Sequence, residues 1–133
     1  MNTIEWKNEF ETGNSEIDTQ HRIFVRIVDK LVTTKNNNGD EHLLESLLAE
    51  LLKFAEFHFC SEENLMREHG YPDFIHHRKE HERALAELRN RIFSLKYEYI
   101  DFVNLESYLI NWFSQHTITE DLKLAAYLKK KKQ

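Results

Sequence analysis

Residues 44–65 read LESLLAELLKFAEFHFCSEENL, and the spacing within this stretch decides the fold. Large apolar residues recur every three or four positions, which is the repeat of one face of an α-helix. That face comprises Leu44, Leu47, Leu51, Phe54, His58, Glu62 and Leu65. Such a face packs against other helices, yet two of its members, His58 and Glu62, are polar. The stretch therefore predicts a long amphipathic helix that turns a histidine and a glutamate toward the core.

Three other stretches of the chain show the same helical period. The inner face of the first comprises His21, Phe24, Val28 and Leu31. The inner face that follows residue 73 comprises His77, His81, Ala84, Leu88, Ile92 and Leu95. The inner face of the last stretch comprises Phe102, Leu105, Leu109, Trp112, His116, Leu124 and Leu128. Histidines from every predicted helix are therefore directed toward one core.

Short breaks separate these helical patterns, at NNNG (36–39), GYPD (70–73) and around YEYID (97–101). Three aspartates are placed to cap the N-termini of the first three helices: Asp18, Asp40 and Asp73. Long amphipathic helices with short connections pack as antiparallel neighbours. The sequence therefore predicts an all-α fold, an up-down-up-down antiparallel four-helix bundle.

We expect a single domain over residues 1–133. An N-terminal arm (1–17) precedes the bundle (about 18–128), and a basic tail (129–133) follows it. Three large apolar residues of the arm are expected to anchor it across the bundle: Ile4, Trp6 and Phe10.

Composition limits the function. The net charge of −5 argues against nucleic acid or an anionic membrane as a partner, because their phosphates attract a basic surface. No apolar run approaches the roughly 20 residues that a membrane span needs, and the N-terminus lacks a signal pattern. The single cysteine, Cys60, excludes an internal disulfide and suits a reducing compartment. We expect a cytoplasmic protein that binds neither nucleic acid nor membrane.

Five histidines and one glutamate lie on the predicted inner faces, and Asp121 follows five residues after the last of these histidines. The full set is His21, His58, Glu62, His77, His81, His116 and Asp121. A single buried histidine is an ordinary core residue. Burying so many polar groups without partners costs several kcal/mol each, which a net stability of about 5–15 kcal/mol cannot absorb. Coordination of metal ions removes this cost, so we predict a metal site.

Seven ligands are too many for one tetrahedral zinc ion, which takes four. They suit two metal ions bridged by both carboxylates, with three histidines on one ion and two on the other. Mixed imidazole and carboxylate ligation permits iron, manganese, copper or zinc. A zinc-protease motif is excluded because Arg78 follows His77 where that motif has glutamate. The remaining histidines are expected at the surface: His42, His69 and His76.

The spacing of His116 and Asp121 conflicts with a regular α-helix. Five residues of α-helix rotate by about 500°, which leaves the two side chains about 140° apart. Both can face the same metal ions only if the helix widens between them. We therefore predict a π-type turn within residues 116–121.

Several motifs together resemble the hemerythrin family in its bacterial single-domain form. They are DTQH at 18–21, HFCSEENLM at 58–66, GYP at 70–72, the pair His77 and His81, and WFSQHTITED at 112–121. The resemblance extends from Trp6 to about Leu128. It implies an oxygen carrier, store or delivery protein that binds O2 reversibly at a non-haem di-iron centre, and not an enzyme.

The same resemblance implies a role for each ligand. One iron would be bound by His77, His81 and His116. The other would be bound by His21 and His58, with an open position for O2. Glu62 and Asp121 would bridge the two iron ions (Fe2+/Fe3+), together with an oxo or hydroxo group. We expect O2 as the ligand, and a monomer.

Two alternatives remain, a di-iron peroxidase or oxidase and an O2-sensing regulatory module. Di-iron enzymes in related bundles use mostly glutamate ligands, which favour high-valent iron, and a site rich in neutral imidazoles favours carriage instead. Two residues depart from the family pattern, Cys60 and Phe113. Cys60 points away from the ligand face, which predicts a core or surface role. Phe113 stands where a smaller aliphatic residue is expected, and it should line the O2 space with Phe24 and Trp112.

Overall fold

The predicted helices form in a computed structural model of the chain, which describes residues 5–97 and 102–131. Helix α1 spans Ser15–Asn36, α2 spans Glu41–Glu68 and α3 spans Phe74–Tyr97. The last rod consists of α4 (Phe102–His116), a π-helix (Thr117–Asp121) and α5 (Leu122–Lys131), which follow one another without a break. The predicted turn at 97–101 falls almost wholly on residues outside the described ranges.

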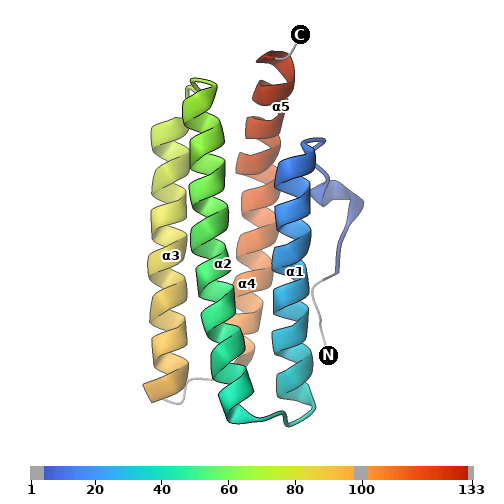
Figure 1. The fold of residues 1–133 in the computed structure, drawn as a ribbon, viewed down its shortest axis with the longest axis vertical. Coiled ribbons are helices and arrows are strands. Elements are labelled where there is room, and N and C mark those ends of the chain that lie inside the picture. Colours follow the sequence, from blue (N-terminus) through green and yellow to red (C-terminus); the bar gives the residue numbers. More distant parts are fainter. Residues whose placement is uncertain (1–4, 98–101, 132–133) are drawn as a thin grey trace.

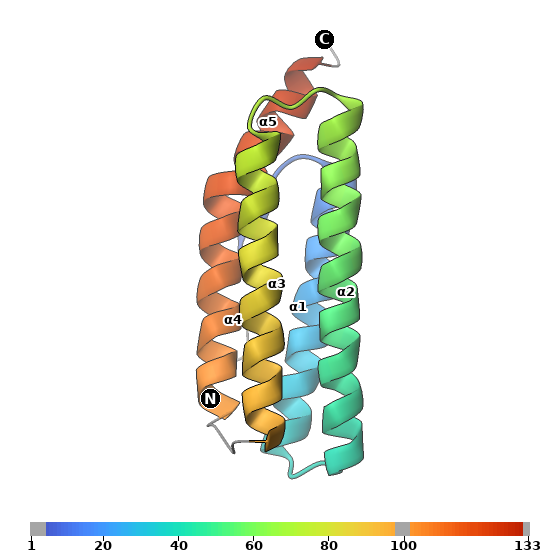
Figure 2. The same cartoon turned by 90° about the vertical axis from the view of Figure 1, so that its left-hand side faces the viewer.

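Each helix packs against its neighbours in a closed ring, α1 on α2, α2 on α3, α3 on α4 and α4 on α1. Figures 1 and 2 show that successive rods run in opposite directions, with α5 projecting beyond the ends of α2 and α3. The predicted inner faces form the core, where Val28, Leu31 and Leu51 have no exposed surface. The up-down-up-down four-helix bundle is confirmed.

The outer faces of the helices are charged, as amphipathic helices require. Neighbouring helices exchange ion pairs there, such as Lys30 with Glu50 at 3.4 Å and Arg89 with Glu56 at 3.0 Å. Exposed pairs of this kind contribute little to stability. Within residues 5–97 and 102–131, no helix combines the length and the apolar character that crossing a membrane requires.

The prediction that Asp18 caps the first helix is wrong. The helix begins three residues earlier, and Asn14 caps it by accepting a hydrogen bond from the Ile17 N–H at 3.0 Å. Asp40 does cap α2, since its carboxylate accepts from the Leu43 N–H at 3.2 Å. Asp73 directly precedes α3, and its carboxylate pairs with Lys123 of α5.

Asp18 instead ties the arm to α1. Its buried carboxylate accepts hydrogen bonds from the Thr12 N–H at 3.0 Å, the Thr12 hydroxyl at 2.7 Å and the Gly13 N–H at 3.2 Å. Gly13 has a φ of +89°, a conformation that glycine adopts readily. An aspartate near the start of a helix can accept N–H groups from the helix or from the chain before it, and spacing alone does not distinguish the two.

The arm is anchored by aromatic rings. Phe10 is 1% exposed and meets Phe113 edge-on, with ring centroids 5.0 Å apart. Trp6 packs on Phe10 at 5.6 Å, and the Arg22 guanidinium lies over the Trp6 ring at 4.6 Å. The short 3-10 helix Asn8–Phe10 also contacts the π-helix. Two of the three predicted anchors therefore pack on the bundle, and Ile4 lies outside the described residues.

The ends of the bundle differ slightly from the predicted boundaries. Helix α1 begins at Ser15, inside the segment assigned to the arm, and α5 continues to Lys131, inside the segment assigned to the basic tail. Lys129, Lys130 and Lys131 belong to the last turn of α5, where their charge complements the negative end of the helix dipole.

We expect Asp18→Ala to lower the free energy of unfolding by about 2–3 kcal/mol, because it removes a charged acceptor that holds three donors of the arm. Urea denaturation followed by circular dichroism measures the loss. Asp29→Ala, at an exposed site of the same helix, is the matched control and should change stability by less than about 0.5 kcal/mol. Equal losses of unfolding free energy in the two variants would show that Asp18 does not hold the arm on α1.

Candidate metal centre

The fold brings all seven predicted site residues into one cluster, and none exposes more than 6% of its surface. Helix α1 supplies one of them, α2 and α3 supply two each, and the last rod supplies two across its π-helix. The cluster consists of His21, His58, Glu62, His77, His81, His116 and Asp121. Each histidine directs its Nε2 atom toward the two carboxylates.

The Glu62 carboxylate divides the histidines into two groups. Its Oε1 atom lies 3.1 Å from Nε2 of His77 and 3.2 Å from Nε2 of His81. Its Oε2 atom lies 3.0 Å from Nε2 of His58 and 3.6 Å from Nε2 of His21. One glutamate therefore presents one oxygen to each group.

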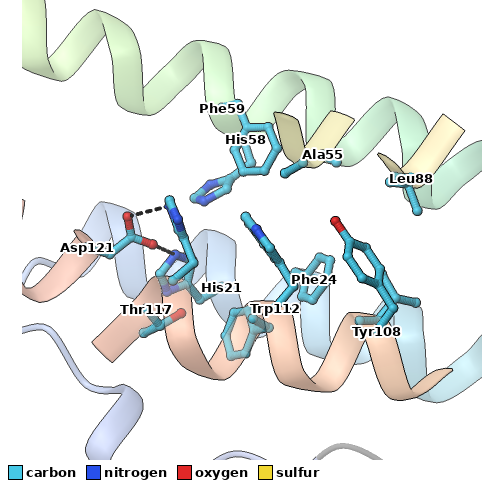
Figure 3. A pocket seen from close by; sticks show the side chains of 14 residues that line it. His21, Phe24, Ala55, His58, Phe59, Leu88, Tyr108, Trp112, Thr117 and Asp121 are labelled. Carbon is cyan, nitrogen blue, oxygen red and sulfur yellow. Dashed lines mark ion pairs between the residues drawn. The ribbon is translucent and has the colours of Figure 1, made fainter. Parts of the chain in front are cut away.

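The Asp121 carboxylate divides the histidines in the same way. Its Oδ1 atom lies 3.1 Å from His77 and 3.2 Å from His116, whereas its Oδ2 atom lies 3.0 Å from His21. Figure 3 shows Asp121 beside His21 at one end of a pocket. The result is a three-histidine group (His77, His81 and His116) and a two-histidine group (His21 and His58), with both carboxylates shared between them. Within each group the possible ligand atoms lie within 4.8 Å of one another.

Several atoms of the cluster are buried without a well-oriented hydrogen bond. Among the residues that the structure describes, these atoms include both oxygens of Glu62, Oδ1 of Asp121 and the Nε2 atoms of His77, His81 and His116. Buried polar atoms without partners are costly, more so when they are charged. Coordination to metal ions would satisfy them, and imidazole with carboxylate is a donor set that iron accepts. The residues therefore fit a pair of metal ions.

The π-helix explains how His116 and Asp121 reach the same cluster. It spans Thr117–Asp121, and the Leu122 N–H donates to the Thr117 carbonyl five residues back. The wider turn returns Asp121 to the side of the rod that His116 occupies. The π-type turn predicted for residues 116–121 is confirmed.

Two outward ring nitrogens have partners that the sequence analysis missed. His58 Nδ1 lies 2.7 Å from Oε1 of Gln20, whose amide in turn donates to the Ser61 hydroxyl at 3.0 Å. His81 Nδ1 lies 2.9 Å from Oε2 of Glu63. An acceptor at Nδ1 keeps the proton on that atom and leaves Nε2 free to bind a metal. Both acceptors adjoin a predicted ligand in sequence, and that adjacency was the available signal.

In the metal-free protein the cluster is a network of opposite charges. Burial alone lowers the pKa of His21, but the adjoining carboxylates outweigh it and raise the pKa from 6.5 to about 9. The same balance raises the pKa of His77 to about 10. Burial works against ionisation of Glu62 and Asp121, yet the surrounding histidines hold the pKa of each acid well below its usual value.

A cavity of about 30 Å³ adjoins the two-histidine group. Both histidines of that group line it, and beyond them the wall is mainly aromatic and aliphatic, including the expected Phe24, Trp112 and Phe113. Figure 3 shows the cavity running from Asp121 and Thr117 toward Leu88 and Tyr108. Tyr108 was not expected here, although it precedes Trp112 by one helical turn and so shares its face.

The other histidines and Cys60 lie outside the cluster. His42 and His76 are exposed as expected, and His76 pairs with Glu120 at 3.0 Å. His69 is half-buried instead of exposed, because its ring lies against the Leu65 carbonyl at the end of α2. Cys60 is an exposed free thiol.

Comparison with known proteins identifies a family. The sequence pattern of the Hemerythrin HHE cation binding domain matches residues 12–128. A bacteriohemerythrin of Clostridium acetobutylicum is 27% identical over 121 residues, which cover 87% of this chain and 94% of that protein. A bacteriohemerythrin of Campylobacter jejuni is 32% identical over 120 residues, which cover 90% of each. The structure of a wild-type hemerythrin superposes with a TM-score of 0.85 at 24% identity, covering 96% of this chain and 98% of that one.

We expect the metal-free protein to lose stability as the pH rises from 6.5 toward 9–10. Protonated His21 and His77 stabilise the folded state fully below pH 6.5, and this contribution disappears as the pH passes their raised pKa values of about 9 and about 10. Each histidine accounts for up to about 1.4 kcal/mol per pH unit in this window. Thermal unfolding at several pH values, with a chelator present, measures the slope.

The iron-loaded protein serves as the control, because coordinated histidines are already neutral and lose no charge over this pH range. Its melting temperature should stay nearly level over the same pH range. Equal slopes in the two forms would mean that the cluster histidines do not hold protons in the metal-free state.

Proposed function

The chain belongs to the hemerythrin family, which binds O2 at non-haem iron, and from this premise we propose that the seven clustered residues hold two iron ions. The observation that carries the proposal is the division of each carboxylate, one oxygen toward the three-histidine group and one toward the two-histidine group. A carboxylate placed in this way suits a bridge between two metal ions. Coordination would then provide partners for both carboxylates and for the Nε2 atoms of the five histidines.

The two irons would differ in their open positions. The three-histidine group offers three nitrogens and two carboxylate oxygens, whereas the two-histidine group offers two nitrogens and the same number of oxygens. The iron held by His21 and His58 would therefore have the additional free position. Both of these histidines line the cavity, together with His116 of the three-histidine group. The cavity and the free position together support O2 binding at this iron.

The chain's own residues supply the environment of the reaction. When bound, the iron pair provides the electrons that O2 needs to bind and recovers them when O2 leaves. The buried carboxylates offset the positive charge of the metal ions, and Gln20 and Glu63 hold the rings of His58 and His81 in the orientation that coordination requires. The aromatic wall keeps bulk water from the open position.

The size of the cavity supports carriage of O2 over oxidation of an organic substrate. A single water needs about 10–15 Å³ of such space, so a cavity of about 30 Å³ has room for a diatomic molecule. An oxidase would need room for its substrate beside the open iron. We therefore propose a reversible O2 carrier, and the oxidase is the alternative that the experiment must exclude.

We also propose that the protein is a cytoplasmic monomer. The exposed free thiol of Cys60 supports a reducing compartment, since such thiols form disulfides where conditions are oxidising. The oligomeric state stays a prediction, which size-exclusion chromatography with light scattering can test.

We expect the purified protein to contain two iron ions per chain and to bind O2 reversibly, with a visible spectrum that appears in O2 and disappears when O2 is removed. Removal of iron should lower the melting temperature markedly, because metal binding is coupled to folding. Iron analysis, optical O2 titration and thermal unfolding measure these properties. One iron per chain, or continuous O2 consumption in the presence of a reductant and an organic substrate, would contradict the proposed carrier.

Phe113 forms the cavity wall next to the two-histidine group. Its ring meets His21 edge-on at 5.3 Å and stacks on Phe24 at 5.1 Å, while Phe10 of the arm closes its outer side at 5.0 Å. Only 2% of Phe113 is exposed. A ring in this position restricts the movement of both O2 and water.

We therefore expect Phe113→Leu to speed O2 association and to raise the rate of autoxidation. Its stability should fall by only about 1–2 kcal/mol, as for a modest core truncation. Stopped-flow mixing with O2 and an autoxidation time course measure the two rates. Phe57→Leu, which shortens an exposed ring on α2, is the control and should change neither. If Phe113→Leu loses stability while both rates stay the same, Phe113 only packs the core.

A further inference from the structure

Thr117 carries a buried hydroxyl without a partner. The residue directly follows His116 and opens the π-helix, and it is 1% exposed. Within the part of the chain that the structure describes, its Oγ1 atom forms no hydrogen bond. A buried hydroxyl left in this state costs stability, so its presence needs a physical reason.

The backbone of the same turn does not provide that reason. Threonine hydroxyls in helices commonly donate to the carbonyl four residues earlier. Thr119 does so, since its hydroxyl donates to the Gln115 carbonyl at 2.6 Å. Thr117 lies only two residues away in the same π-helix, yet among the described residues it makes no such bond. Its hydroxyl remains available as a donor.

The position of this hydroxyl indicates what it is available for. Thr117 lines the cavity together with His21, His58 and Asp121. Figure 3 shows Thr117 at the same end of the cavity as Asp121 and His21, with Tyr108 at the opposite end. Most of the remaining wall is aromatic or aliphatic. Thr117 thus lies at the end of the cavity nearest Asp121 and His21, and its hydroxyl has no hydrogen-bond partner among the described residues.

We propose that Thr117 donates a hydrogen bond to the small ligand that occupies this cavity beside the two-histidine group. The inference rests on the proposed function, because it assumes that iron places a ligand there. The cavity volume of about 30 Å³ suits a ligand of two or three atoms. The hydroxyl selects ligands with a lone pair turned toward it, such as O2 and small anions, over ligands that cannot accept a hydrogen bond.

Azide binding to the diferric protein is the direct test, because azide is a small anion with terminal acceptor atoms. Thr117→Val removes the hydroxyl at nearly constant shape and should weaken azide binding about tenfold. Thr117→Ser keeps the hydroxyl and should bind within about twofold of the original protein. The infrared stretch of bound azide should shift in D2O in the original protein and in Thr117→Ser, and the shift should be lost in Thr117→Val.

The stability of the metal-free protein separates this role from a structural one. Without a ligand the Thr117 hydroxyl has no partner, so Thr117→Val should leave the melting temperature of the metal-free protein unchanged or raise it. If the hydroxyl had a hydrogen-bond partner in the protein, Thr117→Val would lower the melting temperature of the metal-free form. Thr119→Val is the matched control, and it should leave azide affinity unchanged.

The outcomes are distinct. If the original protein binds two irons and azide but Thr117→Val binds azide equally well, the role of Thr117 is refuted and the metal centre stands. A lowered melting temperature of metal-free Thr117→Val also refutes it. If the original protein binds neither two irons nor azide, the proposed function itself fails. Should Thr117→Val not fold, Thr117→Ala also removes the hydroxyl, and its comparison with Thr117→Ser decides the question.

Discussion

Two negative charges buried at the centre of the bundle are the constraint on which the rest of the structure depends. Glu62 and Asp121 are each 1% exposed, and water cannot offset their charge there. Five imidazole rings surround them, and each ring is delivered by a different turn of the four rods. The helices must keep their present register, because a shift of one turn in any of them would separate a histidine from its carboxylate by about 5.4 Å.

This constraint reaches the backbone and the arm. Asp121 meets the cluster only because the rod widens into a π-helix, and the 3-10 helix of the arm packs against that same segment. Phe10 of the arm contacts Phe113, which contacts His21. The hydrogen bonds from Thr12 and Gly13 to Asp18 therefore do more than fix the N-terminal arm. They position the outer layer of the aromatic wall beside the cluster of histidines and carboxylates.

Much of this arrangement could be predicted from the sequence because the relevant patterns are local. The helical period that identifies α2 also places His58 and Glu62 on its inner face, and the five-residue interval from His116 to Asp121 is incompatible with a regular α-helix. Contacts between helices leave a weaker signal, since adjacency to a predicted ligand does not say which side chain is contacted. The bond of Gln20 to His58 joins α1 to α2, and it follows from how the two helices face each other, which no spacing within one helix records.

The wrong prediction at Asp18 and the state of the Thr117 hydroxyl, for which the sequence analysis made no prediction, have a common physical cause. A short polar side chain can satisfy its own helix or reach a neighbouring segment, and both choices fit the same local sequence. Asp18 binds the arm instead of its own N-terminus, and Thr117 leaves unused the backbone bond that Thr119 forms. Both lie within one turn of a cluster histidine. These local hydrogen-bond preferences fail next to the cavity and the buried charges, which restrict what the backbone and side chains can do. Departures from local preference are expected at functional sites.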